Sequence, residues 1–287
     1  MKGLEKTASR RRFFRRGLEV GGGLLAVQAG QAAPANETLK TIHALRSIHG
    51  DFSDKQVPAE QVQTILDASI RAANASNAQT YSIVVSRDPA KIQKLTGYRA
   101  TCLLLYCADY TRLADVAKHL ADPFTPVDME AFVTSSTNTI LAAQTAVIAA
   151  KSMGIDSLLT NGIHRGDIER LWEILDLPQE SCFPLIALIL GYPKSEPAFR
   201  MGRLQGPGVV HYEKFHKLSA PEMDDIVRQH DDPALHLGLN DGWRERGHKH
   251  YLDWFYKEWM GRNKPPAGES AIFKRLKKSG FIDGQRG

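Results

Sequence analysis

The chain has 287 residues, of which 43% are hydrophobic and 24% are charged, a composition typical of a globular protein with one large core or two small ones. Its formal net charge is +5. Residues 1–35 hold seven of the 37 basic and two of the 32 acidic residues, which leaves 30 of each in the body. Residues 36–287 are therefore neutral overall, which gives no reason to expect nucleic-acid binding. Three cysteines are too few for a disulfide framework, and their spacing matches no metal site.

The first 35 residues have the features of an export signal. Arg10, Arg11 and Arg12 follow Ser9, and a Gly-, Ala- and Leu-rich stretch then ends in small residues. Paired arginines after Ser, with a nearby Phe, resemble the twin-arginine signal. The apolar stretch is too short and too Gly-rich for a stable membrane span. We therefore expect residues 1–35 to be a twin-arginine-type signal peptide and the protein to be periplasmic. The alternative is a basic tail that stays on a cytoplasmic protein.

Hydrophobic periodicity predicts the secondary structure in chain order. We expect a short N-terminal helix before residue 45, a helix over 58–72, a strand over 81–86, a short helix over 90–95, a buried strand over 102–108, a long helix over 130–153, a helix over 166–175, a strand over 183–190, a candidate short strand at 209–210, and helices over 221–229 and 251–259. The long helix is apolar around most of its circumference, so it should be central.

This order indicates an α+β fold. The first long helix precedes the first strand, and the longest helix separates the second strand from the third. No GxGxxG follows the first strand, which argues against a Rossmann domain. We therefore expect a mixed sheet flanked by helices. We assign residues 36–210 to the main domain and 211–287 to a C-terminal extension, whose aromatic helix should pack on the body or on a second subunit.

The three cysteines are expected to be buried thiols. Cys102 and Cys107 are five residues apart in one predicted strand, so their side chains should point to opposite faces of the sheet. Cys182 stands alone just before the next predicted strand. Six histidines after residue 210 form no spacing that suits a metal, and no metal is expected.

Four short segments combine turn residues with polar and basic side chains. They are LRSIHGDF at 45–52, SNAQ at 76–79, the stretch from MGI to NGI over 153–163, and LGYP at 190–193 with RMGRL at 200–204. In this order and spacing they resemble the FMN-dependent nitroreductase family, from about residue 41 to residue 204. Arg46, Ser47 and Phe52 match the family's first motif. Leu45 replaces its first arginine, and His49 replaces its last basic residue.

The resemblance implies a phosphate site built from distant segments. Arg46 and Arg203 would bind the FMN phosphate, because guanidinium groups suit a phosphate dianion. Ser47 could add a hydroxyl hydrogen bond. His49 occupies the position of the family's cation near flavin N1 and O2, which stabilises the reduced flavin. Since the charge of an imidazole changes near neutral pH, we expect the flavin potential or the rate to rise as the pH falls through about 6–7.

The resemblance also implies contacts to the flavin ring. Asn77 and Gln79 match the family's Asn-x-Gln, and an amide such as that of Asn77 can meet the donors and acceptors of the pyrimidine edge. In the family a backbone N–H after the central helix contacts flavin N5. By position that loop includes Asn161 and Gly162, and the glycine would allow close approach.

The function implied is an FMN-dependent oxidoreductase of nitroreductase type that works as an intertwined homodimer with flavin at the subunit interface. Electrons or hydride would pass in a ping-pong sequence to a nitroaromatic, quinone or similar acceptor, with no side chain needed as acid or base. The segment 110–132, with Phe124 and Phe132, would shape the substrate pocket. The donor would be NAD(P)H in the cytoplasm, and a quinol or redox protein after export.

Two alternatives remain open. The first keeps the flavin and the fold but catalyses dehalogenation or an O2-dependent reaction. The second is an exported binding or structural dimer that has lost FMN. The colour of the purified protein distinguishes the second from the flavoproteins.

Overall fold

The computed structural model describes residues 36–124, 127–262 and 268–282, so the expected signal peptide lies outside the described residues. Four strands form one sheet in the order β1-β2-β4-β3: β1 (Tyr81–Ser86), β2 (Cys102–Asp109), β4 (Cys182–Gly191) and β3 (Asp156–Thr160). All three neighbouring pairs are antiparallel. The predicted α+β class is confirmed. The sheet itself is antiparallel, and the one parallel element among the described residues is an isolated bridge between Ser47 and Ser157.

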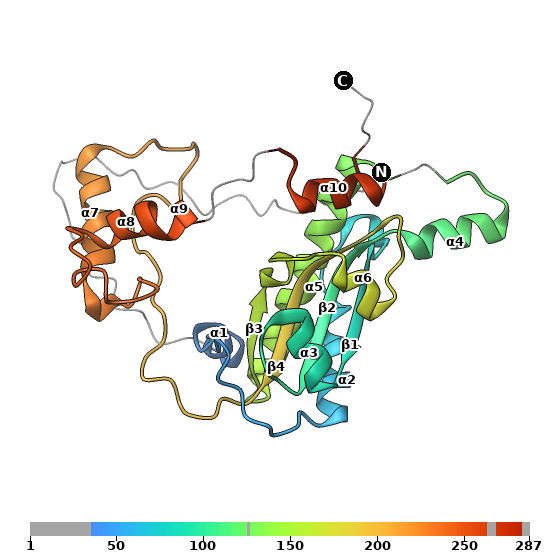
Figure 1. Ribbon diagram of the computed structural model, residues 1–287, viewed down its shortest axis with the longest axis horizontal. Helices are drawn as coiled ribbons and strands as arrows, with labels where there is room; N and C mark the ends of the chain where they lie inside the picture. The colour runs from blue at the N-terminus through green and yellow to red at the C-terminus, as the bar shows by residue number, and fades with distance from the viewer. Residues whose placement is uncertain (1–35, 125–126, 263–267, 283–287) are drawn as a thin grey trace, which may run out of the picture.

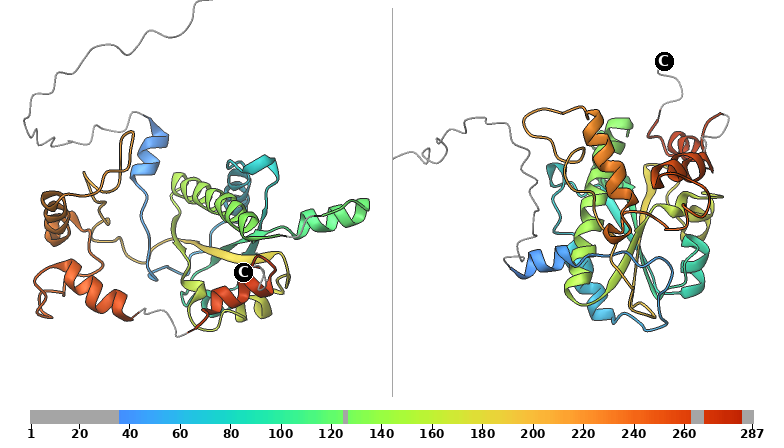
Figure 2. Two further views of the ribbon diagram at one scale, coloured as in Figure 1. Left: turned by 90° about the horizontal axis from the view of Figure 1, so that it is seen from above. Right: turned by 90° about the vertical axis from the view of Figure 1, so that its left-hand side faces the viewer.

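Helices cover the two faces of this sheet, a second group forms a separate lobe, and α4 projects away from the sheet (Figures 1 and 2). They are α1 (Glu37–His43), α2 (Ala59–Ser69), α3 (Pro89–Thr96), α4 (Thr111–Leu120), α5 (Met129–Ser152), α6 (Arg170–Leu175), α7 (Ala220–Asp231), α8 (Tyr251–Trp254), α9 (Met260–Arg262) and α10 (Ala271–Lys278). A π-helical stretch, η4 (Phe255–Trp259), links α8 to α9, and short 3-10 turns occur at η1 (Ala75–Asn77), η2 (Gly162–His164) and η3 (Pro233–Leu235).

The central strand β2 explains how the two layers form. All eight of its residues are buried, and their side chains alternate between two clusters. Leu103, Leu105 and Cys107 pack with α3, α6 and α10. Cys102 and Leu104 pack with α2 and α5. The prediction that Cys102 and Cys107 face opposite sides is therefore confirmed, and all three cysteines are buried free thiols.

Helix α5 lies along the sheet because its inner face is made of small residues. Ala142, Ala143, Ala146 and Ala150 are fully buried, and side chains of this size let a helix approach closely. Its outer face is also apolar but remains open to solvent: Met129, Val133, Ile140 and Leu141 are each more than two-fifths exposed. The helix is thus central, as predicted, yet one side of it has no partner within the described chain.

The C-terminal residues divide into a lobe and a returning helix. In Figure 1 the lobe containing α7, α8 and α9 stands apart from the sheet, around a small cluster of Trp243, Tyr251 and Trp254. Helix α10 then packs on the main core. Its Arg275 side chain is fully buried, with the guanidinium 3.6 Å from the centre of the Trp172 ring, and Phe281 joins the core cluster.

Several sequence predictions need correction. The candidate strand at 209–210 is not a strand, and the helix expected to begin at residue 166 begins at Arg170. Strand β3 and helices α4 and α10 were not predicted from the sequence; they are short elements of five, ten and eight residues. Among the described residues no helix is long and apolar enough to span a membrane.

Candidate functional site

The first motif lies against the end of the sheet that also carries the LGYP segment. The Ile48 N–H donates to the Ser157 carbonyl at 3.0 Å, so the motif runs along the outer edge of β3. Phe52 is 2% exposed and forms a bridge with Pro193. Its ring lies where a Cβ on Gly191 would be only 2.9 Å away, which requires glycine at that position. The first, third and fourth motifs therefore meet at β3 and the end of β4.

Arg46 takes part in a buried ion-pair network. Its Nε and Nη2 donate to the two carboxylate oxygens of Asp156 at 3.1 and 2.6 Å, and Lys151 Nζ donates to Asp156 Oδ1 at 2.7 Å. Arg46 also pairs with Glu196. The Asp156 side chain is 5% exposed. Burial by itself would raise the pKa of Asp156, but the hydrogen bonds from Arg46 and Lys151 outweigh it, and the pKa is lowered.

A cavity of about 410 Å³ opens beside this network. Its walls include three cationic side chains, those of Arg46, Lys151 and Arg200, together with Ala44, Pro197 and Phe199. Arg200 also donates to the His43 carbonyl at the end of α1. The concentration of cations in one cavity suits a bound anion.

Arg203, the second predicted phosphate ligand, is exposed and does not line this cavity. Its Nη1 donates to the carbonyls of Met201 and Gly202, at 3.3 and 2.7 Å. In one chain, therefore, the structure places Arg46 with Arg200 and Lys151. Arg200, Lys151 and Asp156 were not among the site residues predicted from the sequence. Lys151 had a usable signal, since it lies in the last turn of the long helix, just before the third motif.

Ser47 and His49 have exposed side chains on the outer edge of the sheet. The turn that follows them lies on Tyr98: Gly50 has a φ of +87°, and a Cβ there would be 3.2 Å from the Tyr98 ring. Tyr98 thus connects the first motif with the cavity on the α3 side of the sheet.

That second cavity has a volume of about 500 Å³ and lies at the other end of β3. Gly162 and Tyr98 line it, together with residues of α3 and of the segment that leads into α6. Asn161, the other predicted residue of this loop, is exposed. The Gly162 N–H donates to the Thr160 hydroxyl at 2.9 Å, so a flavin N5 at this amide would share or replace that hydrogen bond.

The loop of the second motif is strained and firmly held. Ser76, Asn77 and Gln79 all have φ near +50°, a region that residues other than glycine rarely occupy and that is enriched at functional sites. Asn138 of α5 fixes the loop, because its Oδ1 accepts from the Ala75 N–H at 2.9 Å. The side chains of Asn77 and Gln79 are exposed, so the loop presents two amide groups outward.

Within one chain, the second motif does not lie next to the other three motifs. Asn77 and Gln79 precede β1, whereas Arg46 and Ser47 lie on β3, and these strands form opposite edges of the sheet. Two strands separate them, so the distance across the sheet is about 14 Å. Within the segment 110–132, the Phe132 ring packs on Phe183 and Phe281, with ring centres 5.6 and 5.1 Å apart.

Among the described residues no three His, Cys, Asp or Glu side chains gather in a way that could hold a metal ion. The histidines of the lobe instead pair with single carboxylates. His250 Nδ1 lies 2.6 Å from Asp231, and His248 Nε2 lies 2.7 Å from Glu258. These pairs connect segments within the lobe, so we assign them a structural role.

Comparison with known proteins identifies the family and the relatives of this chain. The nitroreductase family model matches residues 42–192, which is more than half of the chain. An NADPH-flavin oxidoreductase from Vibrio harveyi is 32% identical over 199 residues, which cover 67% of this chain and 78% of that protein. An FMN reductase (NADPH) from Bacillus subtilis is 28% identical over 221 residues, covering 74% and 85%.

The solved structures show the same fold. NADPH:FMN oxidoreductase from Vibrio harveyi, solved in complex with NAD+, has a TM-score of 0.68 and 25% identity, and the match covers 86% of this chain and 100% of that one. The segments that carried the resemblance, the α+β fold and the sequence matches all lead to one conclusion. The chain belongs to the nitroreductase family.

Proposed function

We propose that two copies of this chain bind FMN between them and use it to pass electrons from a donor to a small organic acceptor. The chain is an FMN-dependent oxidoreductase, and the finer assignment rests chiefly on one observation. A cation-lined cavity and the Asn161–Gly162 loop lie at the two ends of the same edge strand, β3. Four residue steps of an extended strand span about 13 Å.

The cavity at the start of β3 fits the phosphate end of FMN. Arg46, Lys151 and Arg200 supply positive charge there, and the exposed Ser47 hydroxyl lies on the same edge. Arg203 follows Arg200 by three residues and would join this site by releasing the two backbone carbonyls that it now contacts. Arg46 keeps its orientation because Asp156 holds it from behind.

The loop at the end of β3 fits the ring end. When bound, FMN supplies the group that accepts an electron pair from the donor and returns it to the acceptor. The chain's part is to position that group: the glycine at 162 permits close approach of the backbone, and the Tyr98 ring borders the same cavity. His49, one residue before the turn on Tyr98, would place its imidazole at the position of the family's cation near flavin N1 and O2.

The second motif completes the site from the partner subunit. Its strained loop holds Asn77 and Gln79 outward, and a single chain places them about 14 Å across the sheet from the first motif. The outer face of α5, with Val133, Ile140 and Leu141 exposed, offers an apolar surface for a second copy.

Mixed dimers test this arrangement directly. One chain carries Arg46→Ala and the other Asn77→Ala, each with a different affinity tag, so that the mixed dimer can be isolated. If the site is shared, the mixed dimer contains one intact site and one site that lacks both residues. It should then bind about one FMN per dimer with wild-type affinity, whereas both single-variant homodimers bind weakly. A mixed dimer that binds no better than its parents would refute the shared site.

The donor depends on where the protein works. The named relatives use NADPH, which supports NAD(P)H for this chain if it stays in the cytoplasm. The leader supports export with FMN already bound, and a quinol or redox protein would then replace NAD(P)H. Cell fractionation of the wild-type chain and of an Arg10→Lys/Arg11→Lys variant decides this. We expect the wild type in the periplasm and the variant in the cytoplasm. Equal distributions would show that the leader does not direct export by this route.

A further inference from the structure

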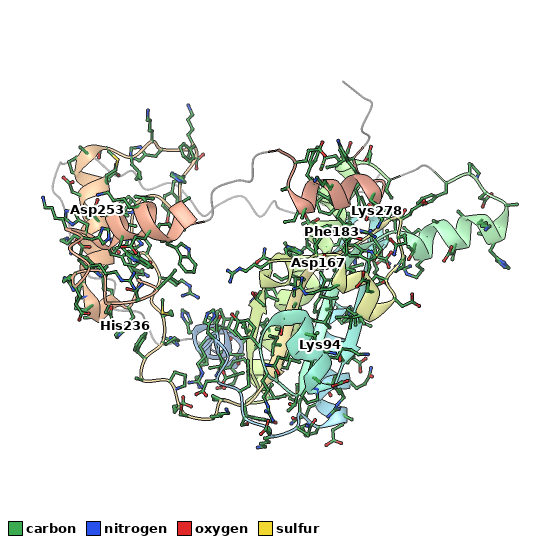
Figure 3. The ribbon with its side chains drawn as sticks, in the orientation of Figure 1. Lys94, Asp167, Phe183, His236, Asp253 and Lys278 are labelled. Atoms are coloured by element: carbon green, nitrogen blue, oxygen red, sulfur yellow. The ribbon has the colours of Figure 1, made fainter. Side chains whose placement is uncertain are left out.

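The cavity on the α3 side of the sheet is lined by more cationic than anionic side chains. Its volume is about 500 Å³, within the range of sites that hold small organic ligands. Three cationic residues line it, Lys94, Arg165 and Arg170, against one carboxylate, that of Asp167. Lys94 on α3 and Asp167 just before α6 are labelled in Figure 3.

Arg170 is committed to holding the walls of this cavity together. Its guanidinium donates to the carbonyls of Leu95 at 3.1 Å, Ile163 at 2.8 Å and Arg165 at 3.1 Å, and also contacts the carbonyls of Lys94 and Asp167. It therefore ties the last turn of α3 to the loop that contains Gly162. It also covers carbonyls at the end of α3 that would otherwise repel an anion.

Lys94 and Arg165 differ from Arg170, because their charged groups have no partner within the described residues. Within the described residues neither side chain forms a salt bridge or a hydrogen bond, and both are exposed. The one carboxylate nearby, Asp167, accepts from the Glu169 N–H at 3.0 Å. Two unpaired cations that line one cavity from different segments are suited to an anionic group on a ligand.

We propose that Lys94 and Arg165 bind the anionic group, a carboxylate or sulfonate, of a small planar electron acceptor, so that the enzyme prefers acidic acceptors to neutral ones. The inference rests on the proposed function, because the same cavity contains Gly162 and Tyr98. An acceptor bound through its acidic group at the α3 end would extend its reducible group toward the flavin loop. Lys94 and Arg165 are thus specificity-determining residues, and they take no part in the electron transfer.

The test compares 4-nitrobenzoate with its neutral analogue 4-nitrobenzamide, using the purified dimer loaded with FMN. We expect a higher kcat/KM for the anion in the wild type. Lys94→Gln and Arg165→Gln should each lower kcat/KM for 4-nitrobenzoate about five-fold, the range of an exposed ion pair, and leave 4-nitrobenzamide unchanged. Lys91→Gln is the matched control, because Lys91 lies one turn earlier on α3 and does not line the cavity.

A second readout needs no turnover. Titration calorimetry of 4-nitrobenzoate into the oxidised enzyme, without donor, should show the same loss of affinity in the two variants and none in Lys91→Gln. Reduction of 4-nitrobenzamide reports separately on the proposed function. If the wild type reduces both compounds with equal kcat/KM, or if the variants affect both equally, the proposal is wrong while the oxidoreductase assignment stands. It is equally wrong if the variants change only the preference for NADPH over NADH, since the cations would then serve the donor.

Discussion

Replacing Asp156 by Asn should destabilise the protein and weaken the contact that holds the first motif on β3. We do not place Asp156 among the residues that contact FMN. The carboxylate accepts three hydrogen bonds, two from Arg46 and one from Lys151, and is 5% exposed. Asn keeps the shape but removes the charge, and its one carbonyl oxygen cannot serve both cations. Arg46 keeps Glu196 as a partner, whereas the variant leaves two cations facing a neutral amide.

The magnitude follows from the burial of these bonds. A hydrogen bond to a charged group contributes about 1.5–3 kcal/mol, and a partner left without its bond adds a desolvation cost. Because Asn retains part of the hydrogen bonding, we expect the free energy of unfolding to fall by about 2–3 kcal/mol at pH 7. The affinity for FMN should fall as well, since Arg46 would no longer be held in one orientation.

The effect should depend on pH in a defined direction. The pKa of Asp156 lies below its ordinary value of 3.8 in the folded protein. A carboxyl group with a lowered pKa stabilises the folded state above the unfolded pKa, and this stabilisation is lost as the pH falls through the folded pKa. The difference between wild type and Asp156→Asn should therefore be constant from pH 7 down to about 5 and should shrink below about 4.

Urea denaturation at a fixed protomer concentration measures this difference. Asp54→Asn is the matched control, because Asp54 pairs with Arg99 at 3.2 Å but the two side chains are 74% and 65% exposed. Its effect should stay below about 1 kcal/mol. Equal losses of stability in the two variants at pH 7, or a loss in Asp156→Asn that is the same at pH 3.5 as at pH 7, would contradict this prediction.

Three further predictions concern other parts of the molecule. Gly191→Ala should lower stability by about 1–3 kcal/mol, because the new Cβ would lie 2.9 Å from the buried Phe52 ring; an unchanged melting temperature would contradict this. Arg275→Ala should cost about 3 kcal/mol through the space left over Trp172, and Arg275→Met should recover most of it in urea denaturation; equal losses would show that charge, and not packing, matters there. His49→Lys should raise the flavin midpoint potential at pH 7, because an ammonium group there would stabilise the anionic reduced flavin, as measured by redox titration; an unchanged potential would show that residue 49 does not set it.

Local elements and motifs in this protein could be recognised from the amino-acid sequence. Strands β1, β2 and β4 and helices α2 and α5 could be predicted within a few residues, because their apolar residues recur at strand or helix spacing. The alternation along β2 placed Cys102 and Cys107 on opposite faces for the same reason. The turn glycines and the basic residues near them identified the motifs.

The way in which these elements and motifs meet could not be predicted from the sequence. In the folded chain the first motif pairs with the outer edge of β3, Arg46 contacts Asp156 across 110 residues of sequence, and Asn77 lies in the loop before the opposite edge strand, β1. Periodicity reports whether a residue is buried, but it does not report which distant segment buries it. Strand order and long-range ion pairs depend on the free energy of the whole assembled core, so no local pattern in this chain reveals them.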